Sequence, residues 1–388
     1  MKEHQVDASS IAVLGAAGSQ ARGMIRALGR AGDLAGLLAI DLRWDPEVES
    51  EYAALGIETV TADVLGADRS LLDARAGDIG LLVNMAGPFY VLGTAPLERA
   101  MEIGADYLDI CDDVDATEDA LALSDRVEAA GIHALLGMGS SPGTTNILIR
   151  AALDALGDPA AAEVRLAWIV DVGDMTRAAL IHAIHCLATA VPGSQGVPPW
   201  DELDPKMVDF PDPVGRQLVI LHGHPEPLTI PRFLGVPRVT NHGGLAPEEV
   251  LRPYWEFARE ADAVHGHAMP EDIFSKFQRI QREIVGEGQR FGSGMQIDVT
   301  IDGDGYRFAA GSEMPMDEAT GVPAAAGVLL MGERPFEGPG IYAPECLRPA
   351  HFFGKLRHVS KGGGGLQLHE LGGGLPGDRV RIRDLLAV

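Results

Sequence analysis

Residues 13–24 read VLGAAGSQARGM, and this stretch predicts how the chain begins to fold. It overlaps the end of a short apolar run over residues 11–14, which suits a buried strand. Beyond it, four apolar residues recur at the spacing of one helix face: Ala21, Met24, Ile25 and Leu28. The glycines therefore lie between a strand and an amphipathic helix, where they form either a phosphate-binding loop or a plain structural turn.

The small residues of this loop favour phosphate binding. A small residue at 15 permits a tight turn, Gly18 lets a pyrophosphate approach the backbone, and Ala21 lets the helix pack closely on the strand. The N–H groups and the dipole at the helix start favour an anion. Because the motif stands in a strand–helix–strand context, we expect a dinucleotide to contact the loop. The expected contacts are Gly15, Ala17, Gly18, Ser19 and Gln20.

The residues after the next two apolar runs bear on the choice of cofactor. Asp41 would accept hydrogen bonds from the adenosine ribose, which favours NAD. Arg43 could instead hold the 2′-phosphate of NADP, so NADP stays open. We expect Asp63 and Val64 near the adenine, with a helix N-cap as the alternative role for Asp63.

Short apolar runs alternate with helical stretches in the first 147 residues, which predicts a parallel sheet covered on both faces. The runs are 11–14, 37–40, 57–60, 79–84, 106–110 and 133–138, with helices expected at 93–103 and 115–130. In the middle of the chain, turn-linked strands favour a mixed or antiparallel sheet. They are expected at 163–172, 216–222, 295–301 and 305–310. The predicted fold class is α/β: a Rossmann doubly wound parallel sheet with an inserted α+β domain.

Composition narrows the class of protein. The chain has 388 residues and a formal net charge of −25, and a surface this acidic repels nucleic acid and anionic membranes. The sequence contains no run of about 18 uncharged apolar residues, so we expect no membrane span. The three cysteines, Cys111, Cys186 and Cys346, are widely spaced and odd in number, which indicates reduced thiols and a cytoplasmic location.

Three further stretches resemble a known family. They are NMAGPFYVLGTAPLERAMEIGADYLDICDD at 84–113, GMGSSPGTTNIL at 137–148 and TGVPAAAGVLLMGERPFEGPGIYAPE at 320–345. With the glycine loop they resemble the saccharopine dehydrogenase-like family, of the saccharopine reductase or lysine 6-dehydrogenase type. The resemblance implies a Rossmann domain over 1–147, an inserted substrate or dimerisation domain over 148–318, and a return to the Rossmann domain with a tail over 319–388. It also implies hydride transfer at a carbon–nitrogen bond.

The matching stretches supply further candidate site residues. We expect the residues after the fourth strand, and a serine after the sixth, to lie beside the nicotinamide: Asn84, Ala86, Gly87, Pro88, Phe89 and Ser140. Ser141 and Asn146 are expected to bind substrate, although the Ser-Pro-Gly turn could equally be a domain hinge. Asp112 is expected to bind a substrate ammonium and Asp113 to take part in catalysis. Both acids could equally cap the following helix.

Histidines concentrate in the insert. His182 and His185 share a face of an expected helix, while His222, His224 and Glu226 share a face of an expected extended segment. A histidine acid or base suits amine or imine chemistry near neutral pH. A metal site and ordinary surface or core histidines are the alternatives, and we expect no metal.

Gly223-His224 resembles a Gly-His pair that borders the substrate in the family. This resemblance makes His224 the favoured catalytic residue, ahead of His182 and His185. His222 and Glu226 are expected to bind substrate. Arg232 is a candidate clamp for a substrate carboxylate, with a plain salt bridge as the alternative. His265 and His267 belong to the same histidine-rich stretch.

The predicted function is an NAD(P)-dependent oxidoreductase acting on a C–N bond of an amine, an amino acid or an imine, and a homodimer is expected. One alternative is a homospermidine synthase-like enzyme that recycles its NAD internally, and the other is a non-catalytic dinucleotide sensor. Lysine occurs only at positions 2, 206, 276, 355 and 361. The lysine–histidine pair of some saccharopine dehydrogenases therefore has no place in the Rossmann half, and their substrate cannot be carried over.

Overall fold

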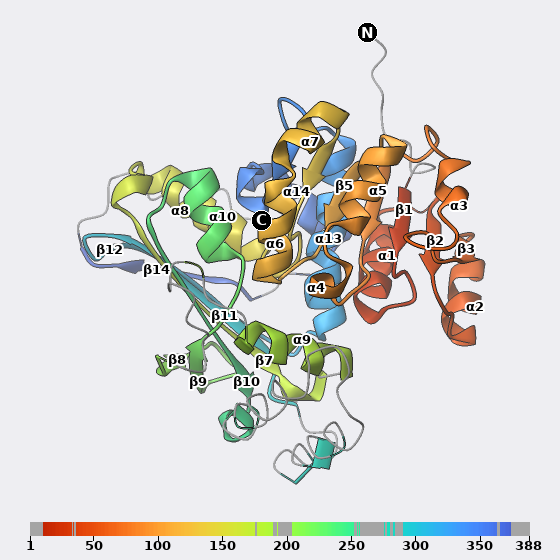
Figure 1. Cartoon of the computed structure of the whole chain (residues 1–388). Coiled ribbons are helices and arrows are strands. Elements are labelled where there is room, and N and C mark those ends of the chain that lie inside the picture. The colour runs from red at the N-terminus through yellow and green to blue at the C-terminus, as the bar shows by residue number, and fades with distance from the viewer. Residues whose placement is uncertain are drawn as a thin grey trace. The chain divides into compact units, whose positions relative to one another are not determined.

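The computed structural model divides the chain into two compact units (Figure 1). Unit 1 comprises Met1–Ile147, Asp317–Gly362 and Leu385–Val388, and unit 2 comprises Leu148–Met316 and Gly363–Asp384. The structure describes residues 11–32, 34, 36–174, 177–188, 192, 204–251, 254, 256, 275, 278–279, 282–283, 290–362 and 365–373. His265 and His267 lie outside these residues.

Unit 1 is built on a seven-stranded sheet whose strand pairs are all parallel. The strand order is β13-β6-β5-β4-β1-β2-β3, so the chain starts in the middle and winds out to both sides, as in a doubly wound fold. The strands are β1 Ile11–Leu14, β2 Leu38–Asp41, β3 Glu58–Thr61, β4 Leu81–Asn84, β5 Asp106–Asp109, β6 His133–Leu135 and β13 Gly340–Tyr342. The predicted α/β class is confirmed.

Helices connect these strands (Figure 1). They are α1 Ser19–Ala31, α2 Pro46–Ala54, α3 Ser70–Asp73, α4 Phe89–Leu92, α5 Ala95–Ile103, α6 Val114–Ala122, α7 Ser124–Ala130, α13 Met316–Gly332 and α14 Pro349–Val359. The expected single helix over 115–130 is wrong, because Leu123 separates α6 from α7. α1 and α13 approach closely through Gly23 and Gly321. A Cβ on Gly23 would lie 2.0 Å from the Asp317 carbonyl oxygen.

Unit 2 is built on a second seven-stranded sheet, of order β14-β12-β11-β7-β10-β9-β8. β10 pairs with β7 in parallel and the other neighbours are antiparallel, so the predicted mixed sheet is confirmed. The strands are β7 Glu163–Asp171, β8 Lys206–Asp209, β9 Arg216–Leu221, β10 Arg238–Ala246, β11 Ser293–Ile301, β12 Asp304–Ser312 and β14 Gln367–Leu371. The unit also contains α8 Thr144–Leu156 from residue 148 on, α9 Arg177–Ala188 and α10 Glu226–Leu234.

Two features of unit 2 differ from the sequence expectation. β10 is a full strand in a segment where none was expected, whereas the short strand of the glycine-rich tail is present as β14 and pairs with β12 at the sheet edge. The segment HGHPEP was expected to be extended throughout, which is wrong because α10 begins at Glu226.

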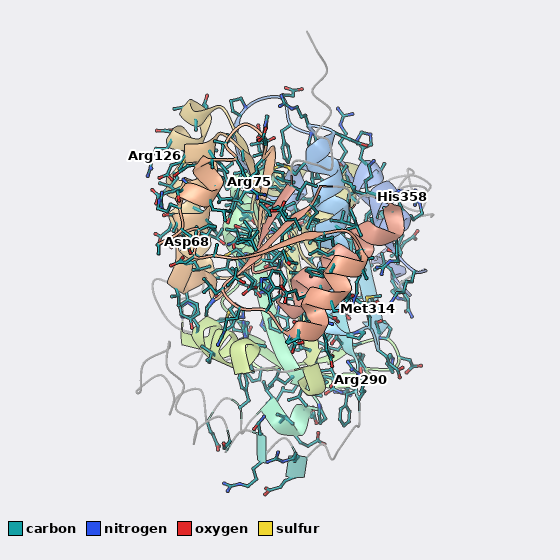
Figure 2. The ribbon with its side chains drawn as sticks, turned by 90° about the vertical axis from the view of Figure 1, so that its right-hand side faces the viewer. Asp68, Arg75, Arg126, Arg290, Met314 and His358 are labelled. Atoms are coloured by element: carbon teal, nitrogen blue, oxygen red, sulfur yellow. The ribbon has the colours of Figure 1, made fainter. Side chains whose placement is uncertain are left out.

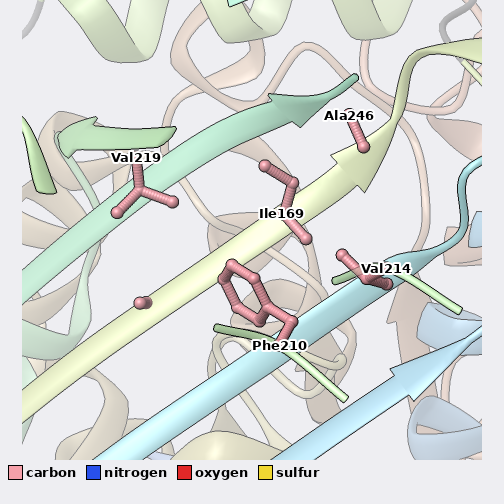
Figure 3. Packing of buried hydrophobic residues seen from close by; sticks show 6 residues of the cluster. Ile169, Phe210, Val214, Val219 and Ala246 are labelled. Carbon is pink, nitrogen blue, oxygen red and sulfur yellow. The ribbon is translucent and has the colours of Figure 1, made fainter. Parts of the chain in front are cut away.

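A cluster of buried apolar side chains packs beside this sheet (Figure 3). Ile169 and Val219 come from β7 and β9, while Phe210 and Val214 come from the loop that joins β8 to β9. Removing such groups from water is the main force that holds a sheet and its loops together.

The surface carries ion pairs that do not organise the fold. Arg75 and Arg126, labelled in Figure 2, pair with Glu58 and Glu98 at N–O distances of 2.7 and 2.8 Å. Exposed pairs of this kind contribute about 1 kcal/mol or less. Across the part of the chain that the structure describes, no helix combines the length and apolar character needed to cross a bilayer.

Candidate functional site

The loop between β1 and α1 holds its glycines for two different reasons. Gly15 has φ +70°, and a Cβ there would lie 2.6 Å from the backbone N and Cα of Ala86. The protein's own packing therefore requires a glycine at 15. Gly18 has an ordinary φ of −65°, is exposed, and its Cβ would meet only the Gly15 carbonyl oxygen at 3.1 Å.

Gly18 is the N-cap of α1 and has no side chain with which to cap the helix. The first turn also contains no acidic residue. The N–H groups of a first helical turn need acceptors, and the helix dipole favours negative charge there. A pyrophosphate fits this position, because the exposed Gly18 and Ser19 leave the helix start open.

Asp41 at the end of β2 holds the glycine loop in place. Its Oδ2 accepts the Ala17 N–H at 3.0 Å and its Oδ1 accepts the Arg43 N–H at 3.2 Å. A carboxylate has about four lone-pair sites, so a ribose diol can bind as well. The Tyr52 hydroxyl supports the same loop by donating to the Ala16 carbonyl oxygen at 2.8 Å, and burial raises the pKa of Tyr52.

The two predicted adenine contacts have local structural roles. The Asp63 carboxylate accepts the N–H groups of Gly66 and Ala67 at 3.0 and 3.4 Å, so it folds the turn after β3. Val64 is buried. Contact of either residue with a cofactor stays a prediction.

The segment after β4 forms a second loop at the same edge of the sheet. Asn84 is buried, and its Oδ1 accepts the Ala86 N–H at 3.1 Å. The Gly87–Pro88 peptide is cis, and Phe89 then opens the short helix α4, none of whose residues is buried. Since the carboxyl ends of parallel strands meet at one edge, this loop and the glycine loop share that edge.

Asp113 occupies the N-cap position of α6 but does not cap it with its side chain. Its Oδ2 instead accepts the Tyr90 N–H of α4 at 3.0 Å, while its backbone oxygen accepts from Thr117. Capping by the Asp113 carboxylate is therefore wrong. Asp112 is half-buried beside it. Catalysis by Asp113 and substrate binding by Asp112 stay predictions.

Asp109 at the end of β5 belongs, with Asp112 and Asp113, to the acids around Cys111 that could bind a substrate ammonium, a role that stays a prediction. It is buried, and its Oδ1 accepts the N–H groups of Cys111 and Gly137 at 3.1 and 2.7 Å, which joins the ends of β5 and β6. Burial raises the pKa of Asp109 to about 6, against the lowering effect of its hydrogen bonds. Only tertiary packing buries this carboxylate, so composition and spacing carry no signal for it.

The turn before α8 is closed by Asn146. Its Oδ1 accepts from the Gly143 N–H at 3.0 Å and from the Thr145 hydroxyl at 3.1 Å. Its Nδ2 donates to Glu345 Oε2 at 2.9 Å, and both side chains are fully buried. The amide therefore joins the helix start to the C-terminal segment. Substrate binding by Asn146, Ser140 and Ser141 stays a prediction.

Unit 2 holds a buried polar group around His224. His224 Nδ1 lies 2.5 Å from Glu226 Oε2, and the same oxygen accepts the Asn241 Nδ2–H at 3.0 Å. Asn241 Oδ1 accepts the Trp168 Nε1–H at 2.8 Å. The ring of His222 packs edge-on against Trp168, with centroids 4.8 Å apart. Neither Trp168 nor Asn241 was expected from the sequence.

The other candidates of the insert lie on two helices. His182 and His185 are half-buried on α9, and His182 Nε2 lies 3.4 Å from the Cys186 sulfur. Arg232 is exposed on α10, with its guanidinium 5.8 Å from the Phe233 ring centroid. Their catalytic and carboxylate-binding roles stay predictions.

Comparison with known proteins was made by sequence and by structure. No protein-family model and no curated protein matches the chain. Saccharopine dehydrogenase (L-Glu forming) from Saccharomyces cerevisiae, in its apo form, superposes with a TM-score of 0.60 and 12% identity, covering 94% of this chain and 100% of that one. Homospermidine synthase from Legionella pneumophila, in complex with NAD, superposes with a TM-score of 0.60 and 13% identity, covering 93% of this chain and 91% of that one. The chain therefore has a saccharopine dehydrogenase-like fold, as its motifs predicted.

Proposed function

We propose that the protein is an NAD(P)-dependent oxidoreductase that acts on a carbon–nitrogen bond of an amine, an amino acid or the corresponding imine. The observation that carries this proposal is the β1–α1 loop. Gly18 leaves the start of a 13-residue helix uncapped and exposed, and Asp41 stands one strand away with room to bind a ribose. The fold shared with saccharopine dehydrogenase and with NAD-bound homospermidine synthase supports it.

The residues of unit 1 would hold the cofactor through the start of α1, Asp41 and the loop after Asn84. A bound nicotinamide ring supplies the acceptor or donor of a hydride. NAD is the favoured form because Asp41 suits a ribose 2′-hydroxyl, whereas exposed Arg43 keeps NADP open. A cytoplasmic location and a homodimer stay predictions.

Oxidation of an amine to an imine removes a hydride from carbon and a proton from nitrogen. His224 is the proposed acceptor of that proton, and it returns the proton in the direction of imine reduction. The short contact between His224 and Glu226 supports this role, because a carboxylate on Nδ1 orients the ring and stabilises the imidazolium form.

Cofactor binding tests the proposal directly. Gly18→Val should weaken NADH binding at least about tenfold in a fluorescence titration, which is about 1.4 kcal/mol, because the new side chain occupies the phosphate position. Gly354→Val is the matched control, since a Cβ at Gly354 meets nothing within 4 Å. Equal affinity in the wild type and Gly18→Val would contradict the proposal.

A screen of amines, amino acids and imines with both cofactors identifies the reaction. Net formation or consumption of NADH marks a dehydrogenase. Homospermidine synthase and saccharopine dehydrogenase superpose on this chain with the same TM-score of 0.60. The second candidate function is therefore a homospermidine synthase-like enzyme that recycles its NAD within one turnover. That candidate converts substrate without net change in NADH. Binding without any turnover marks a dinucleotide sensor.

A further inference from the structure

Four side chains from three elements and one loop of unit 2 form one chain of hydrogen bonds. Trp168 lies on β7, Asn241 on β10 and Glu226 in the first turn of α10, while His224 lies between β9 and α10. Glu226 and Asn241 are fully buried and His224 is 4% exposed. Because Glu226, Asn241 and His224 are buried, water competes little with the hydrogen bonds among these three side chains.

The direction of every bond in this chain follows from its first member. An indole N–H can only donate, so the Asn241 atom that faces Trp168 must be the carbonyl oxygen. The NH₂ group of Asn241 then faces Glu226, and an amide NH₂ also only donates. Glu226 Oε2 is therefore an acceptor.

The same oxygen faces Nδ1 of His224. An ionised carboxylate only accepts, so Nδ1 carries the hydrogen and donates it to Oε2. In the neutral imidazole the lone pair is then on Nε2. The indole of Trp168 thus orients Asn241, and Asn241 holds the carboxylate oxygen that leaves Nε2 as the ring nitrogen able to take a proton.

The backbone makes room for the indole at Gly243, its partner in the β7–β10 register. A Cβ at Gly243 would lie 2.3 Å from Cζ2 and 2.5 Å from Cη2 of Trp168. The indole therefore lies over a position that only glycine leaves empty. A glycine inside a strand otherwise weakens it, so this position serves the indole at a cost to the sheet.

We propose that Trp168 and Asn241 are positioning residues that hold Glu226 Oε2 toward His224 and so keep the Nε2 atom of His224 as the proton acceptor. This inference rests on the proposed function for the catalytic role of His224. The direction of the hydrogen bonds does not depend on that role.

A Glu226→Gln background makes the positioning visible, because a glutamine amide can turn either its oxygen or its NH₂ toward His224. With Asn241 present, its NH₂ should hold the oxygen of the introduced glutamine in the place of Oε2. The His224 ring nitrogens should then show the Nδ1–H tautomer in ¹⁵N NMR, as in the wild type. In Glu226→Gln/Asn241→Leu the amide loses the donor at 241 that favours its oxygen in this place, and the Nε2–H tautomer should appear.

A second double variant leaves Asn241 unchanged, so the test does not depend on how well the Asn241→Leu protein folds. Glu226→Gln/Trp168→Phe retains an aromatic ring and removes only the indole nitrogen and its fused ring, so Asn241 loses the donor that orients it. The ¹⁵N NMR signals of His224 in this double variant should likewise no longer show the Nδ1–H tautomer alone. Loss of that tautomer in Glu226→Gln alone, or its retention in both double variants, would overturn the proposal.

Kinetics separate this inference from the proposed function. Both double variants should have a kcat at least about tenfold below that of Glu226→Gln, with unchanged affinity for NADH, because a wrong tautomer offers no acceptor at Nε2. If His224→Ala leaves kcat unchanged, the catalytic role of His224 fails while the tautomer result still decides the positioning. If His224→Ala abolishes turnover but the tautomers of the double variants differ from those expected, the positioning role of Trp168 and Asn241 fails and the catalytic role of His224 stands.

Discussion

Replacing Asp109 by asparagine should make unit 1 less sensitive to pH. The carboxylate is buried at the end of β5, and both backbone N–H groups that it accepts bind the same oxygen, Oδ1. Asparagine keeps one such oxygen and carries no charge. The variant therefore retains the link to Cys111 and Gly137 and removes the buried ionisable group.

The magnitude follows from the pKa of Asp109, which burial raises from 3.8 to about 6. Because the folded pKa is the higher one, ionisation costs more in the folded protein than in the unfolded chain. The stability from this group is complete below about pH 3.8 and is lost as the pH rises through 6. One pKa unit is worth about 1.4 kcal/mol, so the loss is about 3 kcal/mol.

Urea denaturation followed by circular dichroism over this pH range measures the effect. The free energy of unfolding of Asp109→Asn minus that of the wild type should rise by about 3 kcal/mol between about pH 3 and about pH 7. Asp119→Asn, which changes an exposed carboxylate on α6, should leave the corresponding difference constant. A constant difference for Asp109→Asn would refute the reasoning, since it would mean that burial does not disfavour the ionised carboxylate.

Three further variants test the loop and the histidine. Gly15→Ala should lower the free energy of unfolding by about 1–3 kcal/mol in urea denaturation, because φ is +70° and the new Cβ meets the Ala86 backbone; a variant as stable as the wild type would contradict it. Asp41→Asn keeps an acceptor for the Ala17 N–H and loses the charge, so the ratio of NADPH to NADH affinity in fluorescence titrations should rise at least about tenfold. A wild type that already prefers NADPH would contradict that choice of cofactor. His224→Ala should lower turnover by about 10²–10⁴ while the Kd for NADH stays the same, and full turnover would exclude it as the general base.

The sequence alone determined the class of fold and the place of the glycine loop. Both depend on local patterns: a short apolar run, a glycine turn and a helix face follow each other within residues 11–28, and the strands of unit 1 come in the same order in which they were expected. Strand–helix alternation leaves few ways to pack, so a parallel sheet follows from the pattern itself. A small residue at 15 was expected for the turn, whereas the strict need for glycine comes from φ +70° and the contact with Ala86.

Only the tertiary structure decided the surroundings of the polar side chains. His224 was singled out from its neighbour Gly223, but its partner Glu226 accepts from Asn241 on β10, and Asn241 accepts from Trp168 on β7. Glu226 was assigned to an extended segment, yet it meets His224 from the first turn of a helix. Asp109 resembles any acid at a strand end until the ends of β5 and β6 enclose it. Local spacing specifies helices and strands, whereas burial and hydrogen-bond partners depend on residues brought together by the whole sheet.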